Sequence, residues 1–172
     1  MVKRYIPPIE NERVRLRLLE ESDLPLTLAW RNQDHIRKWF IHSDIILPEQ
    51  HRAWFAKYQE RDDDFIFVIE ELEILRRPVG QVSLHNISWS QQRAEFGRLM
   101  IGDPEARGKG LGKQATQLLL AMAFNQFHLN EVYLTVFEEN APAVAIYQQC
   151  GFQPNGRSND LLKMCLFNTA GG

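Results

Sequence analysis

The stretch 107-RGKGLGKQATQLLLAMAF-124 places three glycines and three cations in seven residues and continues directly into an apolar segment. Glycines let a backbone approach a bound group closely, and the free N–H groups and dipole at the start of a helix attract anions. Apolar residues then recur at helical spacing, so we expect a helix from Gly110 to about Phe127. The stretch therefore predicts a turn and a helix N-terminus that hold a phosphate-like anion.

The composition predicts one globular domain that spans residues 1–172. The chain is 44% hydrophobic and 24% charged, which is enough to bury one substantial core. Its net charge of −2 gives no general attraction to polyanions, so we expect neither a nucleic acid nor a membrane as partner. The longest apolar run, Leu118 to Phe124, is too short to cross a bilayer. We expect a soluble, cytoplasmic protein.

Cysteine and histidine spacing argues against a disulfide framework and a metal site. Cys150 and Cys165 have no CxxC spacing, which is typical of a chain from a reducing compartment. The five histidines form no HExxH motif, and none is paired with a cysteine at a metal-ligand spacing. We therefore expect no metal in this protein.

Hydrophobic periodicity and turn residues predict a mixed α/β chain. The expected strands are Arg13–Leu18, Phe65–Ile69, Val79–Leu84, Ala94–Ile101, Val132–Phe137 and Leu161–Phe167. The expected helices are one opened by Pro25, one after Pro48, the helix from Gly110, and Ala141–Cys150, which Gly151 ends. A hairpin should turn around Arg76-Arg77-Pro78. The strand-helix-strand unit from Ala94 to Phe137 predicts a parallel strand pair.

Two well-known phosphate-binding motifs, the Walker A loop and the dinucleotide fingerprint, are rich in glycine and can be compared with this turn. A Walker A loop, GxxxxGK[ST], fails because Arg107 stands where its first glycine is needed and Gln114 follows Lys113. A dinucleotide fingerprint, GxGxxA, is spelled by residues 110–115, with Glu138 roughly 20 residues further on. In that fold the first glycine follows its strand almost directly, whereas residues 102–109 intervene here. The context therefore disfavours the dinucleotide interpretation.

The turn instead resembles the pyrophosphate loop of the GNAT superfamily of acetyl-CoA-dependent N-acetyltransferases, R/Q-x-x-G-x-G/A, over Arg107–Gly112. A second motif of that superfamily, N-x-x-S/A-x-x-x-Y-x-x-x-G-F, is filled by Asn140, Ala143, Tyr147, Gly151 and Phe152. The resemblance implies the GNAT fold: an α/β (α+β) domain with a mixed, mostly antiparallel sheet, a central pair of parallel strands that splay apart, and flanking helices.

The same resemblance implies acetyl-CoA as co-substrate and a set of residues that bind it. The N–H groups of Lys109 to Lys113 would hold the pyrophosphate, and backbone groups near Leu99 and Ile101 would hold the pantetheine arm. Lys109 and Lys113 could add charge near the adenosine phosphate or remain solvated. The expected cofactor-binding residues are Leu99, Ile101, Arg107, Gly108, Lys109, Gly110, Leu111, Gly112, Lys113, Asn140 and Ala143.

Acetyl transfer to an amine requires a proton acceptor for the amine and a proton donor for the leaving thiolate. Tyr147 matches the tyrosine that the superfamily uses as general acid, although a tyrosine packed between helix and sheet is the alternative. Glu95 stands where several members place a carboxylate that acts as base through water. His85 is the other candidate base, because its pKa suits the task. Glu95 and His85 could instead be ordinary surface residues or residues that pair the two strands of a hairpin. Many relatives need no dedicated base.

The segment 29-AWRNQDHIRKWFIHSDIILPEQHRAWF-55 bears on the acceptor. It resembles the branch of ribosomal-protein N-terminal, spermidine and nucleotide-linked aminosugar acetyltransferases. Its aromatic and cationic residues would suit a nucleotide-linked aminosugar, with Arg31 or Arg37 on phosphate, although tryptophans at this spacing are also typical of a core. A protein or peptide N-terminal amine, a polyamine, and a non-catalytic module that binds coenzyme A remain alternatives. The last strands could pair across a homodimer.

Overall fold

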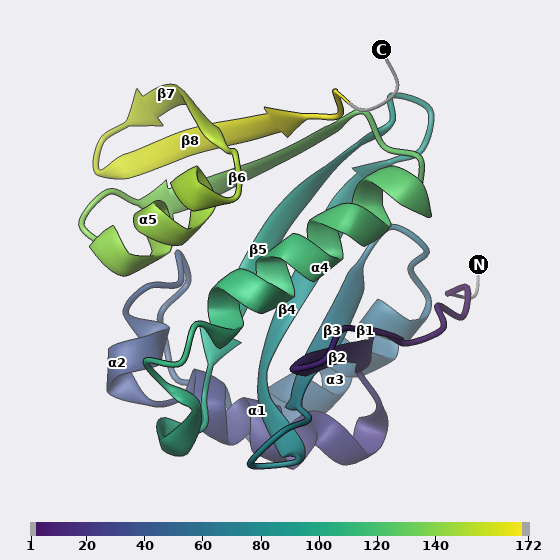
Figure 1. Cartoon of the computed structure of the whole chain (residues 1–172). Helices are drawn as coiled ribbons and strands as arrows, with labels where there is room; N and C mark the ends of the chain where they lie inside the picture. The colour runs from purple at the N-terminus through teal and green to yellow at the C-terminus, as the bar shows by residue number, and fades with distance from the viewer. Residues whose placement is uncertain (1–2, 170–172) are drawn as a thin grey trace.

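In the computed structural model, which describes residues 3–169, one eight-stranded sheet has the order β1-β2-β3-β4-β5-β6-β8-β7 (Figure 1). Its strands are β1 (Ile9–Glu10), β2 (Val14–Leu18), β3 (Phe65–Glu71), β4 (Arg77–Ser88), β5 (Arg93–Ile101), β6 (Glu131–Phe137), β7 (Gln153–Ser158) and β8 (Leu161–Phe167). The α-helices are α1 (Leu24–Arg31), α2 (Asp34–Arg37), α3 (Pro48–Gln59), α4 (Leu111–Asn125) and α5 (Ala141–Gln149). Short 3₁₀ turns, η1 (Glu21–Asp23) and η2 (Pro104–Ala106), precede α1 and α4.

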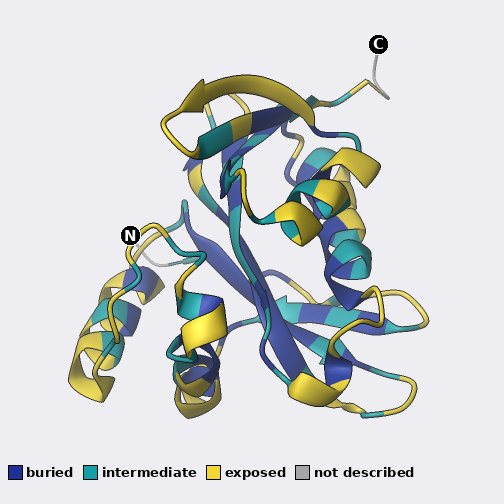
Figure 2. Cartoon of the chain, turned by 90° about the vertical axis from the view of Figure 1, so that its left-hand side faces the viewer, coloured by how far each residue is buried: buried dark blue, intermediate teal, exposed yellow. Residues whose placement is uncertain are grey.

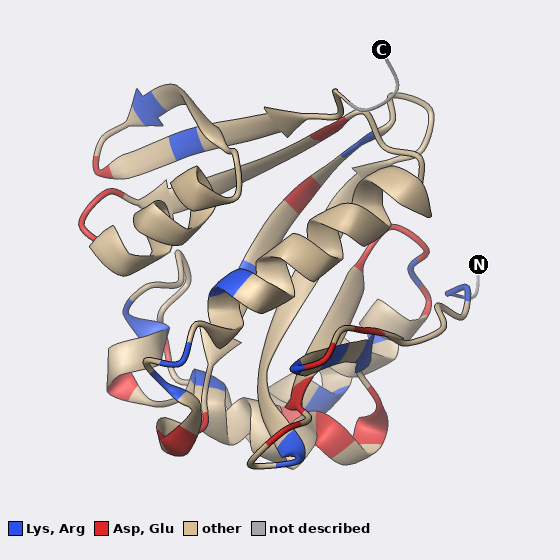
Figure 3. Cartoon of the chain, viewed as in Figure 1, with Lys and Arg blue, Asp and Glu red and all other residues tan. Residues whose placement is uncertain are grey.

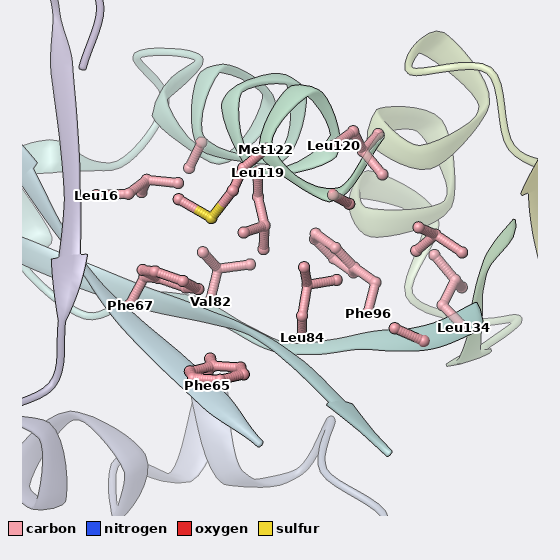
Figure 4. Packing of buried hydrophobic residues seen from close by; sticks show 14 of the residues in the cluster. Leu16, Phe65, Phe67, Val82, Leu84, Phe96, Leu119, Leu120, Met122 and Leu134 are labelled. Atoms are coloured by element: carbon pink, nitrogen blue, oxygen red, sulfur yellow. The ribbon is translucent and has the colours of Figure 1, made fainter. Parts of the chain in front are cut away.

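Helices cover both faces of the sheet, and the central strands between them are buried (Figure 2). On one face, Phe67, Val82 and Leu84 point toward Leu119 and Met122 of α4 (Figure 4). On the other face, residues of β3 that alternate with these pack with α1 and α3: the cluster contains Leu24, Phe55, Tyr58, Ile66 and Val68. Both faces of β3 are covered by helices, which explains why its first five residues, Phe65 to Ile69, are all apolar.

The central parallel pair is confirmed, and its two strands separate soon after they meet. β5 and β6 pair only at Arg93 with Glu131, Ala94 with Val132, and Glu95 with Tyr133. β5 continues to Ile101 and β6 to Phe137 without further pairing to each other. The edge of β5 that faces β6 therefore has unpaired backbone groups beyond Glu95. All other neighbouring strands of the described sheet are antiparallel.

A bulge reshapes β5 beside this opening. The register with β4 passes from Gln81–Met100 to Ser83–Gly97, so that one extra residue of β5 lies opposite Val82. Arg98 takes a left-handed φ of 54° at this point. Bulges bend a strand and redirect its side chains, and they are common next to active sites.

Three local predictions need correction or addition. Arg77 and Pro78 belong to β4 and do not form the turn, which lies before them; the register shift between Ile69 and Glu70 lets Pro78 pair with Glu70 without breaking the ladder. Strand β7 was not predicted because QPNGRS has no apolar alternation, and all six of its residues are exposed. The two-residue β1 and the single-turn α2 are too short for a periodic signal. Within residues 3–169, no helix is long and apolar enough to span a bilayer.

Candidate active site

The glycine turn forms a row of free backbone donors before α4. Gly108 and Gly110 have φ values of 71° and 76°, which an L-residue adopts only at a cost, and Gly110 is the N-cap residue of α4. None of the N–H groups from Gly108 to Lys113 finds an acceptor among the described residues; the first helical bond runs from the Gln114 N–H to the Gly110 carbonyl. Lys and Arg residues stand in the same loop (Figure 3). Such a row of donors with nearby cations fits a pyrophosphate.

Long-range contacts hold this loop in place. The Arg13 guanidinium on the chain before β2 donates to the Lys109 carbonyl oxygen at 2.8 Å. The Asn11 amide donates to the Gln114 side chain at 3.0 Å. Arg107 folds back over the end of β5, where it donates to the carbonyl oxygens of Ile101 and Gly102 at 3.4 Å. The loop is therefore pre-organised before any ligand binds.

A cavity of about 390 Å³, here called the splay cavity, opens where β5 and β6 separate. Its walls come from β5, β6, the start of α5 and the segment around α2. Six of the predicted site residues line it: Leu99, Ile101, Arg107, Asn140, Ala143 and Tyr147. The other predicted cofactor residues, 108–113, follow directly in the glycine turn and do not line this cavity.

Tyr147 lies on α5 at the wall of the splay cavity and is only 7% exposed. Its ring contacts Phe96 and Phe152 edge-on, with centroids 5.5 Å and 5.9 Å away. Its hydroxyl makes no hydrogen bond to any described residue, so it is free to meet a ligand atom. Burial, and to a smaller extent Cys150, raises the pKa of Tyr147 above its ordinary value near 10. The phenol therefore stays protonated across the neutral range.

Asn140 and Ala143 line the splay cavity and also form the N-terminal cap of α5. Asn140 is the N-cap of α5, and its Oδ1 accepts from the Ala143 N–H at 3.4 Å. Capping fixes where α5 begins and thus where Tyr147 is presented. At the other end, Gly151 has a φ of 102° and ends the helix after Cys150, as predicted. Burial raises the pKa of the Cys150 thiol, which makes it a poor nucleophile.

A second cavity of about 630 Å³, here called the larger cavity, adjoins the splay cavity. The two share Trp39, Phe40, Phe96, Gly97, Arg98 and Thr135 as lining residues. Residues of α1, α3 and the loop between α2 and α3 line its far side, Trp54 and His51 among them, with the two rings stacked 5.2 Å apart. Its volume is typical of a site for a small molecule. A molecule bound in the splay cavity and a molecule bound in the larger cavity would therefore meet at the bulge of β5.

Glu95 lines the larger cavity together with His85, so the two candidate bases are neighbours. Nε2 of His85 lies 3.7 Å from Oε2 of Glu95, and the Asn86 amide donates to Oε1 at 2.9 Å. These two groups hold the pKa of Glu95 below its ordinary range although burial opposes them. Nδ1 of His85 lies 3.0 Å from the Ser83 hydroxyl, which itself donates to the Gly97 carbonyl oxygen at 3.1 Å. The contact with Ser83 orients the His85 ring so that Nε2 faces Glu95.

Comparison with known proteins assigns this geometry to a family. A model of the acetyltransferase (GNAT) domain matches residues 13–153. The chain belongs to the GNAT acetyltransferases. As the sequence motifs predicted, this GNAT protein is an acetyl-CoA-dependent N-acetyltransferase with a mixed sheet and a single parallel pair among its described strands.

Relatives of this GNAT protein cover nearly its whole length. It is 27% identical to the spermidine N(1)-acetyltransferase of Vibrio cholerae over 92% of this chain and 95% of that protein. The structure of the Vibrio cholerae spermidine N-acetyltransferase in complex with CoA and spermine has a TM-score of 0.81 and 27% identity, over 91% of this chain and 96% of that one. The putative ribosomal N-acetyltransferase YdaF of Bacillus subtilis is 25% identical, over 87% and 83% of the two chains.

Several residues of the GNAT site were not predicted from the sequence. These are Arg13, Ser83 and the half-buried ion pair of Arg98 with Asp64, whose Nη1 and Oδ1 lie 2.7 Å apart. Each depends on a partner far away in the sequence or on the bulge. No local pattern marks them. Within residues 3–169, no cluster of three or more His, Cys, Asp or Glu residues is placed to hold a metal ion.

Proposed function

We propose that this GNAT acetyltransferase moves an acetyl group from acetyl-CoA to the primary amine of a small acceptor bound in the larger cavity. One observation carries the proposal: the free hydroxyl of Tyr147 in the splay cavity and the carboxylate of Glu95 in the larger cavity flank the same short segment of β5, Phe96 to Arg98. A thioester in the splay cavity and an amine in the larger cavity would therefore meet between a proton donor and a proton acceptor.

The proposed reaction uses the chain's own groups at each step. The free amine attacks the thioester carbonyl carbon, an N–C bond forms, and the C–S bond breaks. Tyr147 gives its proton to the departing thiolate, and the proton that the nitrogen loses on becoming an amide returns to the phenol through water. Glu95, beside His85, takes a proton from the incoming ammonium through water, since its carboxylate is charged at neutral pH. The N–H groups of residues 108–113 would bind the pyrophosphate, and the unpaired edge of β5 at Leu99 and Ile101 would bind the pantetheine arm.

The names of the relatives favour a polyamine as acceptor over the nucleotide-linked aminosugar expected from the aromatic helices. Glu95 is the observation in this chain that supports a polyamine, because a carboxylate attracts ammonium groups. It is the one carboxylate among the residues that line the larger cavity. A primary amine on a small molecule is common to both candidates, and a peptide N-terminus is the third.

The experiment that tests the proposal compares two tyrosine variants. Tyr147→Phe removes the proposed acid, whereas Tyr133→Phe, on β6, removes a hydroxyl that lines neither cavity. Thiol release from acetyl-CoA is measured with the best amine of a panel, and coenzyme A binding is measured by calorimetry. We expect Tyr147→Phe to lose about 10²- to 10⁴-fold in kcat and to bind coenzyme A like the parent.

Equal turnover by the two tyrosine variants would remove Tyr147 from the mechanism. Coenzyme A binding without turnover of any amine would favour the non-catalytic module. Absence of binding would refute the assignment of the glycine turn.

A further inference from the structure

Arg31, the last residue of α1, lines the larger cavity and has one buried nitrogen without a hydrogen-bond partner among the described residues. The residue is 8% exposed and lines the cavity. Its Nη2 donates to the His42 carbonyl oxygen, and its guanidinium lies over the Phe40 ring, 4.4 Å from the centroid. Nη1 is buried and has no hydrogen-bond partner within the described part of the chain. A buried donor without a partner is costly, and native proteins rarely retain one without a reason.

Arg31 pairs directly with no acidic side chain of the described residues, and Asp44 is the one carboxylate near enough to act on its charge. Arg98 is neutralised by Asp64, which lies 2.7 Å from it, and Glu95 is engaged by His85 and Asn86. Arg31 forms no ion pair in residues 3–169; burial and the nearby Arg37 lower its pKa, and Asp44 opposes them in part. An arginine nevertheless stays charged at any physiological pH. An anionic group bound beside Arg31 would give its guanidinium the direct partner that the described residues do not supply.

We infer that the acceptor amine also carries an anionic oxygen group, a phosphate or a carboxylate, which binds Arg31. This inference rests on the proposed function and specifies its substrate class. Nη2 and the face of the guanidinium are engaged by His42 and Phe40, so Nη1 is the terminal nitrogen left for an anion, and phosphate or carboxylate is the group that an arginine fork binds. Glu95 then receives the amine at the wall shared with the splay cavity, and Arg31 binds the anion on the side formed by α1.

The test measures thiol release with four amines at saturating acetyl-CoA. Glucosamine 1-phosphate carries a phosphate, γ-aminobutyrate carries a carboxylate, glucosamine is neutral, and spermidine is a polycation. Arg31→Gln removes the charge, Arg31→Lys keeps the charge without the fork, and Arg52→Gln is the control. Arg52 is an exposed arginine of α3 that does not line either cavity.

We expect an anionic amine to have the highest kcat/KM. Arg31→Gln should lower that value about 10- to 100-fold, with Arg31→Lys intermediate, because a charge-assisted buried hydrogen bond is lost. The KM for acetyl-CoA and the turnover of glucosamine should stay within about twofold, and Arg52→Gln should match the parent. The better of the two anionic amines identifies phosphate or carboxylate as the source of the anion.

Preference for spermidine or glucosamine with no effect of Arg31→Gln would overturn the inference and leave the proposed function standing. If acetyl-CoA binds and all four amines fail, the CoA-saturated protein is titrated with glucose 1-phosphate and with butyrate. Binding that Arg31→Gln abolishes supports the inference, and absence of binding overturns it. If Arg31→Gln does not fold, the amine preference of the parent protein decides. Failure of coenzyme A itself to bind refutes the proposed function instead.

Discussion

The glycine turn provides a quantitative test in two alanine variants, Gly110→Ala and Gly112→Ala. Gly110 has a φ of 76°, and a Cβ there would meet nothing within 4 Å, so its substitution costs backbone strain and no clash. That strain is about 1–2 kcal/mol for an L-residue. Gly112 has an ordinary helical backbone, and a Cβ there would lie 3.5 Å from Ile146 Cδ1, a normal contact. Gly112→Ala should stabilise the helix by roughly 0.5–1 kcal/mol.

The strain in Gly110→Ala must be seen in one of two measurements. If the free protein keeps the left-handed conformation, the free energy of unfolding falls by about 1–2 kcal/mol, or about 2–8 °C in Tm for a chain of this size. If the free loop relaxes, stability is retained and coenzyme A must restore the conformation, which weakens its Kd about 5- to 30-fold. The two losses together should amount to about 1–2 kcal/mol.

The assay is thermal unfolding with and without coenzyme A, together with calorimetric titration. Gly112→Ala is the matched control, and the loop motif of the family accepts alanine at its position. We expect it to bind coenzyme A within about threefold of the parent, because its methyl group packs against Ile146 and adds no backbone strain. If Gly110→Ala keeps both the stability and the coenzyme A affinity of the parent, the predicted strain at this position is absent and the prediction is wrong. An equal loss of affinity in Gly112→Ala would contradict it as well.

Further predictions concern pH and packing. Burial alone would raise the pKa of Glu71, but N–H donors of Leu75, Ile74 and Glu73 outweigh it and hold that pKa below its ordinary range. Its stabilisation is therefore present above about pH 4.3 and is lost as pH falls through the lowered pKa. Glu71→Gln should cost about 1.5–3 kcal/mol in urea unfolding at pH 7 and progressively less in acid; an equal cost at both would contradict this. A Cβ at Gly102 would lie 2.0 Å from Cγ of Trp30, so Gly102→Ala should lower the free energy of unfolding by about 1–3 kcal/mol, and unchanged stability would show that the packing is wrong. Because the pKa of Tyr147 is raised, kcat should show no alkaline loss below about pH 10, and a fall near pH 8 would indicate a different acid.

Periodic and local signals in the sequence were sufficient for most of the fold. Alternation marked β2, and the unit β5-α4-β6 predicted the parallel pair that the structure contains. The signal failed where an element has no apolar face, as in the fully exposed β7, or is a single turn, as in α2. Pro78 predicts a turn, because a proline usually interrupts a strand ladder, and the register shift between Ile69 and Glu70 explains how β4 accepts it.

Some residues of the candidate site could likewise be predicted from the sequence, and others could not. The glycine turn and Tyr147 stand in contiguous motifs, so spacing was enough to single them out. Arg13 could not be linked to Lys109, since 96 residues separate them and the contact exists only in the folded sheet. Arg31 and Arg37 could not be distinguished in the sequence. In the structure Arg37 pairs with Asp34 at 2.9 Å, whereas Nη1 of Arg31 has no partner among the described residues.

We propose that coenzyme A lies in the splay between β5 and β6 with its sulfur at Tyr147. A crystal structure of the protein with bound coenzyme A tests this most directly. We expect pyrophosphate oxygens within about 3 Å of the N–H groups of residues 108–113, the pantetheine arm along β5, and the sulfur within hydrogen-bond reach of the Tyr147 hydroxyl. Coenzyme A bound elsewhere, or bound with its sulfur pointing away from Tyr147, would contradict it.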